Sequence, residues 1–263
     1  MEETRGSSAP QPLNEQVSDW TLQVIKALRA RLGIRIQVHR EGRELQDGKI
    51  FLFNHFARFE TFIPQSIIRE ETGAFCRSVA SRELFKKDTL FSSYLLSIGA
   101  VPNNYERLLP FLAEEILRGR KVIVFPEGGM VKDRKVFGDS TEQYLIYSRS
   151  ARERRPHHSG PAVLSLTLDA FKVGLSELLR QGNRAELNRW ADKLAMSPEI
   201  LEKAIQEPTL VVPSNITFHP IRVDQNILSR GAELLGHDIN PQLAEELLIE
   251  GNLLFRETDM DIR

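Results

Sequence analysis

The chain has 263 residues, of which 41% are hydrophobic, and its formal net charge is -1 at pH 7. This composition is sufficient to bury one core of domain size. A charge so close to neutral argues against nucleic acid as the main partner. The single cysteine, Cys76, excludes an internal disulfide and fits a reducing compartment, and we expect it to be a small core residue.

No stretch approaches the roughly 20 apolar residues that cross a bilayer, and residues 1–14 have no apolar signal-peptide core. We therefore expect a cytoplasmic protein that is peripheral at the inner face of the membrane. The composition of residues 1–14 predicts a disordered tail. Residues 15–32 carry apolar side chains at helical spacing, and this stripe either packs on the domain or lies in a membrane interface.

Strand and helix patterns then alternate, as in an α/β domain. The sequence predicts strands near residues 34–39, 50–54, 74–80, 121–125 and 209–218. It predicts helices near residues 62–71, 88–97, 105–118 and 160–181. We expect one domain over residues 15–223, with a mixed central sheet flanked by helices.

The first chemical motif follows the predicted strand at 50–54, where His55 is succeeded by Glu60. Pro64 delays the next helix, so residues 54–62 are predicted to be a loop. A loop can bring the two side chains together, whereas a continuous helix would place them on different faces. A carboxylate that accepts from one imidazole nitrogen makes the other nitrogen a better general base. The alternative is an exposed histidine beside a solvated glutamate in an ordinary loop.

A second motif follows the predicted strand at 121–125, which Pro126 ends because proline cannot continue a central ladder. Glu127 then also stands at the carboxyl end of a strand, the edge where open α/β sheets bind ligands. Gly128 and Gly129 allow the backbone to approach a ligand closely. Taken alone, such a segment is also common in simple turns.

Together these motifs resemble those of the glycerolipid acyltransferases, which include the 1-acylglycerol-3-phosphate acyltransferases. The family's first motif is asparagine, histidine, four residues and an aspartate, and Asn54 through Glu60 match it except for the glutamate. The second motif begins here as Gly99-Ala100-Val101. Phe125 to Gly128 match the third motif, and Val212 to Ile216 match the fourth, a Val-Pro-x-x-Ile strand. The four matches run in the family's order over residues 45–222.

The resemblance implies an O-acyltransferase that moves a fatty acyl group from acyl-CoA or acyl carrier protein to a hydroxyl of a lysophospholipid or glycerolipid precursor. His55 would be the base and Glu60 would orient it, with no metal or other cofactor. The implied partners are the thioester donor, the lipid acceptor and either a membrane surface or acyl carrier protein. The residues implied to hold the substrate are Asn54, Asn103, Asn104, Arg107, Pro126, Glu127, Gly128 and Gly129.

The chain also departs from the family's pattern. Glu60 stands for aspartate, and Gly129 and Met130 stand for threonine and arginine. Tyr105 replaces a phosphate-binding arginine, which removes a bidentate contact unless Arg107 substitutes for it. Lys132, Arg134 and Lys135 are further candidates for the phosphate contact. The alternative is that these three residues belong to a solvated charged loop. Two alternatives stay open: a catalytically silent lipid-binding or scaffold protein on this fold, and a thioesterase that uses water as the acceptor.

Residues 182–207 are an addition to the family's pattern. One amphipathic helix is indicated by Leu187, Trp190 and Leu194, and a second helix begins at Ser197-Pro198-Glu199, so we predict a helical hairpin. The hairpin binds a membrane, binds a partner protein or covers the sheet edge. The preceding basic run over residues 149–158 is either solvated or binds the phosphates of coenzyme A or the acidic helix of acyl carrier protein. Residues 224–263 predict a C-terminal helical segment.

Overall fold

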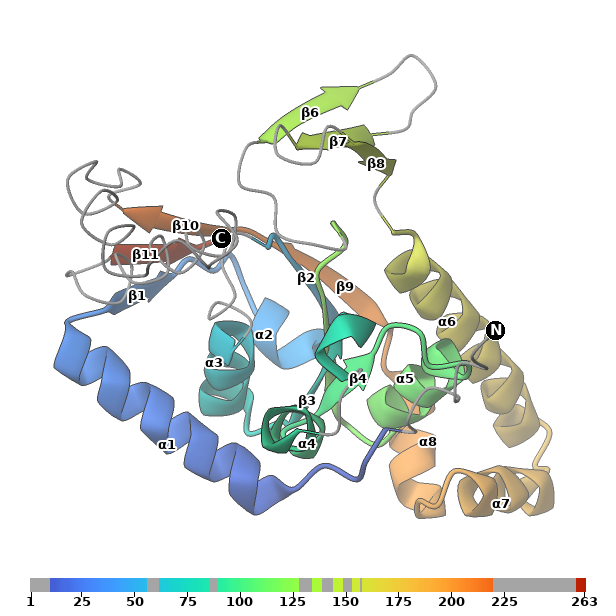
Figure 1. Ribbon diagram of the computed structural model, residues 1–263. Helices are drawn as coiled ribbons and strands as arrows, with labels where there is room; N and C mark the ends of the chain where they lie inside the picture. The colour runs from blue at the N-terminus through green and yellow to red at the C-terminus, as the bar shows by residue number, and fades with distance from the viewer. Residues whose placement is uncertain are drawn as a thin grey trace, which may run out of the picture.

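A five-stranded sheet forms the centre of the computed structural model, which describes residues 10–55, 62–85, 89–127, 134–138, 144–148, 153–156, 158–219 and 259–263 (Figure 1). The strand order is β4-β3-β5-β2-β9, and every neighbouring pair is parallel. The strands are β2 (Gly48–Phe53), β3 (Cys76–Ala80), β4 (Ala100–Pro102), β5 (Lys121–Val124) and β9 (Leu210–Ser214). The α/β prediction is confirmed, but the prediction of a mixed central sheet is wrong.

Mixed pairing occurs instead in a separate three-stranded sheet of β1 (Arg35–Val38), β11 (Asp259–Ile262) and β10 (Ile216–His219). Strand β11 pairs parallel to β1 and antiparallel to β10. The predicted strand near 34–39 thus pairs with the end of the chain, and the strand predicted at 209–218 is divided between two sheets. A helical segment was predicted for residues 224–263. Residues 220–258 lie outside the described part, and the prediction is wrong at 259–262, which form strand β11.

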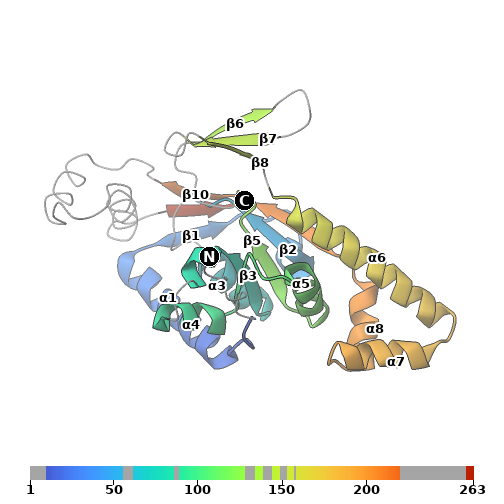
Figure 2. The ribbon, with the colours of Figure 1, turned by 45° about the vertical axis from the view of Figure 1, so that its right-hand side comes forward.

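A third, antiparallel sheet follows β5 and leads into the next helix, at the top of Figures 1 and 2. Its strands are β6 (Arg134–Gly138), β7 (Tyr144–Ser148) and β8 (Glu153–Pro156), in that order. None of these strands was predicted, because charged and apolar residues do not alternate regularly along them.

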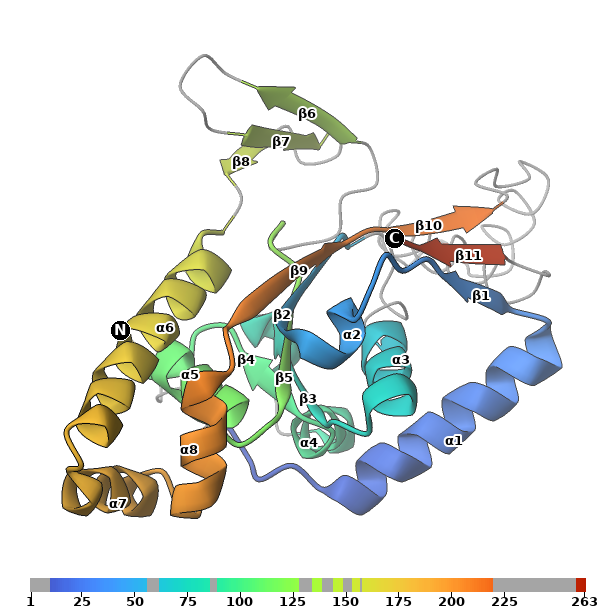
Figure 3. The same cartoon turned by 180° about the vertical axis from the view of Figure 1, so that it is seen from behind.

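Helices cover both faces of the central sheet (Figures 2 and 3). One face carries α5 (Leu108–Leu117), α6 (Gly160–Arg180), α7 (Arg184–Lys193) and α8 (Pro198–Gln206), and the other carries α2 (Glu44–Asp47) and α3 (Phe62–Thr72). Strand β2 connects the two cores because successive side chains point to opposite faces. Ile50 packs in the first core, while Phe51 and Phe53 pack in the second.

Two further helices, α1 (Glu15–Leu32) and α4 (Leu90–Ser97), are joined by a hydrogen bond of 2.9 Å between Thr21 Oγ1 and Tyr94 Oη. Asn14 caps the start of α1 by accepting from the backbone N–H of Val17. The apolar stripe expected over residues 15–32 includes Trp20 and Leu28, but these two side chains are exposed, while Thr21 and Leu22 are buried.

The helical hairpin predicted over residues 182–207 consists of α7 and α8, which pack against α6. Leu187 and Leu201 are fully buried, and Trp190 contacts Phe171 edge to face with 5.1 Å between ring centroids. The apolar stripe of this hairpin therefore faces the domain core, which favours the interpretation as a cover over the fold. Within the described ranges, no helix is both long enough and apolar enough to pass through a bilayer.

Buried charge pairs hold β3 against α5. Arg77 and Glu115 are almost fully buried, and Arg77 Nε lies 2.5 Å from Glu115 Oε2. Burial disfavours the Glu115 carboxylate, but the hydrogen bond and charge of Arg77, together with those of Arg120, outweigh it and lower the pKa of Glu115. Both elements contribute walls to the cavity described next.

Candidate functional site

Asn54 fixes the carboxyl end of β2, where His55 follows. Its side-chain amide donates to the carbonyl oxygen of Ile216 over 2.9 Å, and its Oδ1 accepts from the backbone N–H of Ile216 over 2.6 Å. This pair of bonds imitates a strand pairing between β2 and β10, so Asn54 joins the central sheet to the small mixed sheet. The residue that was predicted to bind substrate thus holds the histidine's backbone in place.

Glu127 connects the two sequence motifs directly. Its carboxylate is buried, and Oε2 accepts from the backbone N–H of His55, 72 positions earlier in the chain, over 3.0 Å. The His55 ring lies against Phe125, with 4.9 Å between centroids and 43° between planes. Because β2 and β5 are adjacent and parallel, both contacts form at the same edge of the sheet.

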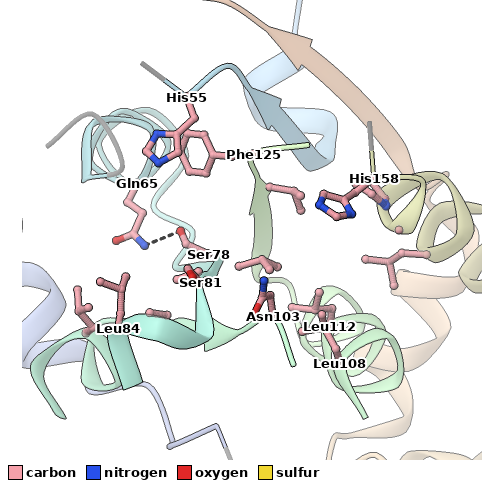
Figure 4. A pocket seen from close by; sticks show the side chains of 18 of the residues that line it. His55, Gln65, Ser78, Ser81, Leu84, Asn103, Leu108, Leu112, Phe125 and His158 are labelled. Carbon is pink, nitrogen blue, oxygen red and sulfur yellow. Dashed lines mark hydrogen bonds between the residues drawn. The ribbon is translucent and has the colours of Figure 1, made fainter. Parts of the chain in front are cut away.

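A cavity of about 400 Å³ lies at this edge (Figure 4). This volume falls in the range of roughly 300–1,000 Å³ typical of small-molecule sites. Most of its wall is apolar and comes from β3, β5, α4, α5 and the start of α6, including Val79, Leu95, Leu108, Leu109, Leu112, Val124, Phe125 and Leu164. The site is thus suited to an apolar ligand.

Few polar side chains interrupt the apolar wall. His55 and Gln65 line it on one side and His158 on another, and Figure 4 shows Gln65 directed toward Ser78. Gln65 Nε2 donates to Ser78 Oγ over 2.7 Å. The remaining polar side chains along the cavity are Ser81, Asn103 and Ser159, which are exposed and mark its open side.

Asn103 and Pro126, both predicted to hold substrate, accept hydrogen bonds from the backbone of other segments. Asn103 lines the cavity, and its Oδ1 accepts from the backbone N–H of Arg82 over 3.0 Å. The carbonyl oxygen of Pro126 accepts from the backbone N–H of His158 over 2.9 Å. This bond joins the segment after β5 to the start of α6. His158, at the end of the basic run, also lines the cavity, although it was not among the predicted site residues.

Asn104 and Arg107 are exposed and are not among the residues that line the cavity. The side chain of Arg107 is 70% exposed, and its Nη2 lies 3.8 Å from Glu114 Oε1. Tyr105, which stands where the family has arginine, packs edge to face on Phe111 at 5.9 Å. Tyr105 and Arg107, where a phosphate contact was expected, therefore lie outside the cavity lining.

Several residues of the sequence prediction lie outside the described part of the chain: Glu60, Gly128, Gly129, Met130 and Lys132. The pairing of His55 with Glu60 thus stays a prediction. Arg134 and Lys135 belong to β6, where the backbone alone is described.

Cys76 is buried in the core, as predicted, and its burial raises the pKa of the thiol to about 12. A thiol with such a pKa is a poor nucleophile at neutral pH. Among the described residues, no three His, Cys, Asp or Glu side chains are grouped so that they could hold a metal ion.

Comparisons with known proteins found no family model that matches the chain and no similar sequence among the curated proteins. The resemblance to glycerolipid acyltransferases therefore rests on its four short motifs. The structure defines an α/β protein with a histidine beside an apolar cavity at the carboxyl edge of a parallel sheet.

Proposed function

We propose that the protein is an O-acyltransferase that moves a fatty acyl group from a thioester donor to a hydroxyl of a lipid or lipid precursor. The observation that carries the proposal is the position of His55 on the wall of an apolar cavity, with its backbone held by Glu127 and its ring against Phe125. An apolar cavity accommodates an acyl chain, and a histidine beside it can activate a hydroxyl.

In the proposed reaction, an imidazole nitrogen of His55 takes the proton of the acceptor hydroxyl as its oxygen attacks the thioester carbonyl carbon. The resulting tetrahedral intermediate collapses, the carbon–sulfur bond breaks, and the imidazolium returns the proton to the departing thiolate. An ester and a free thiol are the products. Glu60 is proposed to accept from the other ring nitrogen and to stabilise the imidazolium.

The donor is proposed to be acyl-CoA or acyl carrier protein, and His158 at the open side of the cavity is a candidate contact for its polar part. The acceptor is a lysophospholipid or a glycerolipid precursor, and the protein would act at the inner face of the membrane as a peripheral protein. The apolar cavity supports a lipid acceptor over a water-soluble one.

The proposal is tested by incubating the protein with hexadecanoyl-CoA and a panel of lysophosphatidate, monoacylglycerol and glycerol 3-phosphate. Release of thiol and the mass of any ester are measured. His55→Ala should lower transfer by about 10²- to 10⁴-fold, the usual contribution of a general base. His39→Ala is the matched control, because His39 pairs with Asp261 in the small mixed sheet.

The results distinguish three hypotheses: an acyltransferase, a thioesterase and a catalytically silent lipid-binding protein. Ester formation by the wild type and by His39→Ala, but not by folded His55→Ala, supports the acyltransferase. Free fatty acid as the sole product would indicate the thioesterase, and binding of acyl-CoA without turnover would indicate the silent lipid-binding protein. Wild-type transfer by a folded His55→Ala variant contradicts the mechanism.

A further inference from the structure

Gln65 and Ser78 form a polar pair within the apolar cavity. Ser78 lies in β3 and is 7% exposed, and Gln65 lies in the first turn of α3. Their hydrogen bond of 2.7 Å crosses the cavity wall on the side of His55 (Figure 4). A polar pair is not needed to fill an apolar wall, so its hydrogen-bonding capacity indicates a ligand group.

The hydrogen bond between Gln65 and Ser78 leaves one hydrogen-bond donor of the pair unused. When the Gln65 amide donates to Ser78 Oγ, the hydroxyl proton of Ser78 has no acceptor among the described residues. If the amide is turned around, so that its oxygen accepts from the hydroxyl, the amide NH₂ becomes the group with protons to spare. In both arrangements an N–H or O–H of the pair is left to donate to a molecule in the cavity.

The strand register places this donor near the reacting end of a bound chain. Ser78 is level with Ile123 of β5, two residues before Phe125, whose ring contacts His55. At about 3.3 Å per residue, the donor lies roughly 7 Å along the strand direction from the level of Phe125. A ligand atom there is separated by only a few bonds from a carbonyl carbon next to His55.

We infer that the Gln65–Ser78 pair binds an oxygen atom on the first carbons of the acyl donor. This inference rests on the proposed function. Two sources supply such an oxygen: the thioester carbonyl itself and a hydroxyl on carbon 3 of a 3-hydroxyacyl chain. The first would make the pair a general feature of donor binding, and the second would make the protein selective for 3-hydroxyacyl donors.

The test compares three probes: hexadecanoyl-CoA, 3-hydroxyhexadecanoyl-CoA and the thioether S-hexadecyl-CoA, which lacks the carbonyl oxygen. Binding is measured by calorimetry in a His55→Ala background, which prevents turnover. The variants are Ser78→Ala and Gln65→Met, of which the second keeps the chain length and removes the polar group. Ser66→Ala is the matched control, since this buried serine donates to the carbonyl oxygen of Ile63 and does not line the cavity.

If the pair binds the carbonyl, Ser78→Ala and Gln65→Met should weaken both thioesters about 2- to 13-fold, the range of one net hydrogen bond, and leave the thioether unchanged. If it binds the 3-hydroxyl, only the hydroxylated probe should weaken. The inference would be overturned if the two variants weakened the binding of all three probes equally, or if they weakened the binding of no probe. The pair would then serve only to link α3 to β3. If none of the probes binds the folded protein, the proposed function fails as well.

Discussion

The carboxylate of Glu127 accepts a hydrogen bond from the backbone N–H of His55 over 3.0 Å. The donor is the backbone N–H and not the imidazole, so this contact holds the main chain of His55 in position. It also joins the carboxyl ends of β2 and β5, which pair side by side in the sheet. Glu127 thus supports His55, the proposed base, whereas the sequence led us to expect that Glu127 holds the acceptor.

Replacement of Glu127 should separate this backbone contact from any effect of charge. Glu127→Ala leaves the backbone N–H of His55 without its acceptor, which should lower the free energy of unfolding by about 1–3 kcal/mol and reduce transfer at least tenfold. Glu127→Gln keeps a carbonyl acceptor and should retain most of both. Urea unfolding and steady-state kinetics measure the two effects. A glutamine variant as impaired as the alanine variant would show that the negative charge is what matters.

Asn54→Ala should destabilise the protein by about 2 kcal/mol or more, because it leaves both the N–H and the carbonyl of Ile216 without a partner. Asn54→Asp keeps the acceptor and loses the donor, so its unfolding free energy should fall between those of the alanine variant and the wild type. Asn104→Ala, at an exposed position, is the control and should change stability by less than about 0.5 kcal/mol. Equal stability of Asn54→Ala and wild type would contradict the assigned role.

Lys121 predicts a specific pH dependence of stability. The residue is 5% exposed, and its ammonium donates to the carbonyl oxygens of Gln46 and Gly48. Burial lowers the pKa of Lys121 from 10.5 to about 8. Between these pH values the unfolded chain binds more protons than the folded one, so this residue's contribution to stability rises with pH, by at most about 1.4 kcal/mol per pH unit.

The measurement is urea unfolding of the wild type and of Lys121→Met at pH 7, 8 and 9. The wild type should gain stability relative to the variant between pH 8 and 9. The thiol of Cys76, whose pKa is about 12 in the fold, has the opposite dependence above about pH 9, but it is present in both proteins. A difference that is constant with pH would show that Lys121 titrates normally.

Trp190 should contribute to stability and not to membrane binding, because its ring packs on Phe171. Trp190→Ala is expected to cost about 2–4 kcal/mol, near the lower end for large aromatic residues since the ring is half-buried. Sedimentation with anionic and neutral vesicles should be the same for variant and wild type. Arg189→Ala, which removes an exposed ion pair with Glu186, is the control for the stability measurement. Loss of vesicle binding by a folded Trp190→Ala variant would revive the membrane interpretation of the hairpin.

Local patterns located β2, β3, β5 and β9 of the central sheet, but they missed β4 and the all-parallel pairing. The apolar runs that become β2 and β5 are each ended by a recognisable signal, and Pro126 and the capped start at Ser197 fall at element boundaries in the structure. The small mixed sheet could not be predicted in this way. Strand β11 has four residues and pairs with β1, more than 200 positions earlier, so the pairing depends on tertiary contacts that no local pattern records.

Only part of the candidate site could be predicted, because local patterns record strand ends but not tertiary packing. His55 and Glu127 stand at strand ends, which sequence patterns can locate. Gln65 and Ser78 belong to a helix and a strand whose sequences give no sign that they face the same space, and only their packing places both on the cavity wall. Arg107 was a phosphate-binding candidate because it lies two residues after Tyr105, where the family has arginine. Its position outside the cavity is set by the start of α5, where Arg107 is the N-cap residue.

The position of Arg107 also determines the expected acceptor. Its side chain is 70% exposed, lies 3.8 Å from Glu114 and is not part of the cavity lining, while Tyr105 packs on Phe111. A bidentate guanidinium–phosphate contact contributes on the order of 1.5–3 kcal/mol, and no arginine or lysine of the described residues lines the cavity to supply it. We therefore expect an uncharged monoacylglycerol to be preferred over lysophosphatidate, and Arg107→Ala to change the KM for lysophosphatidate less than about twofold. Steady-state kinetics with both acceptors measure this, with the exposed Arg180→Ala as the control. A KM for lysophosphatidate that rises tenfold or more in Arg107→Ala alone would show that Arg107 binds the phosphate after all.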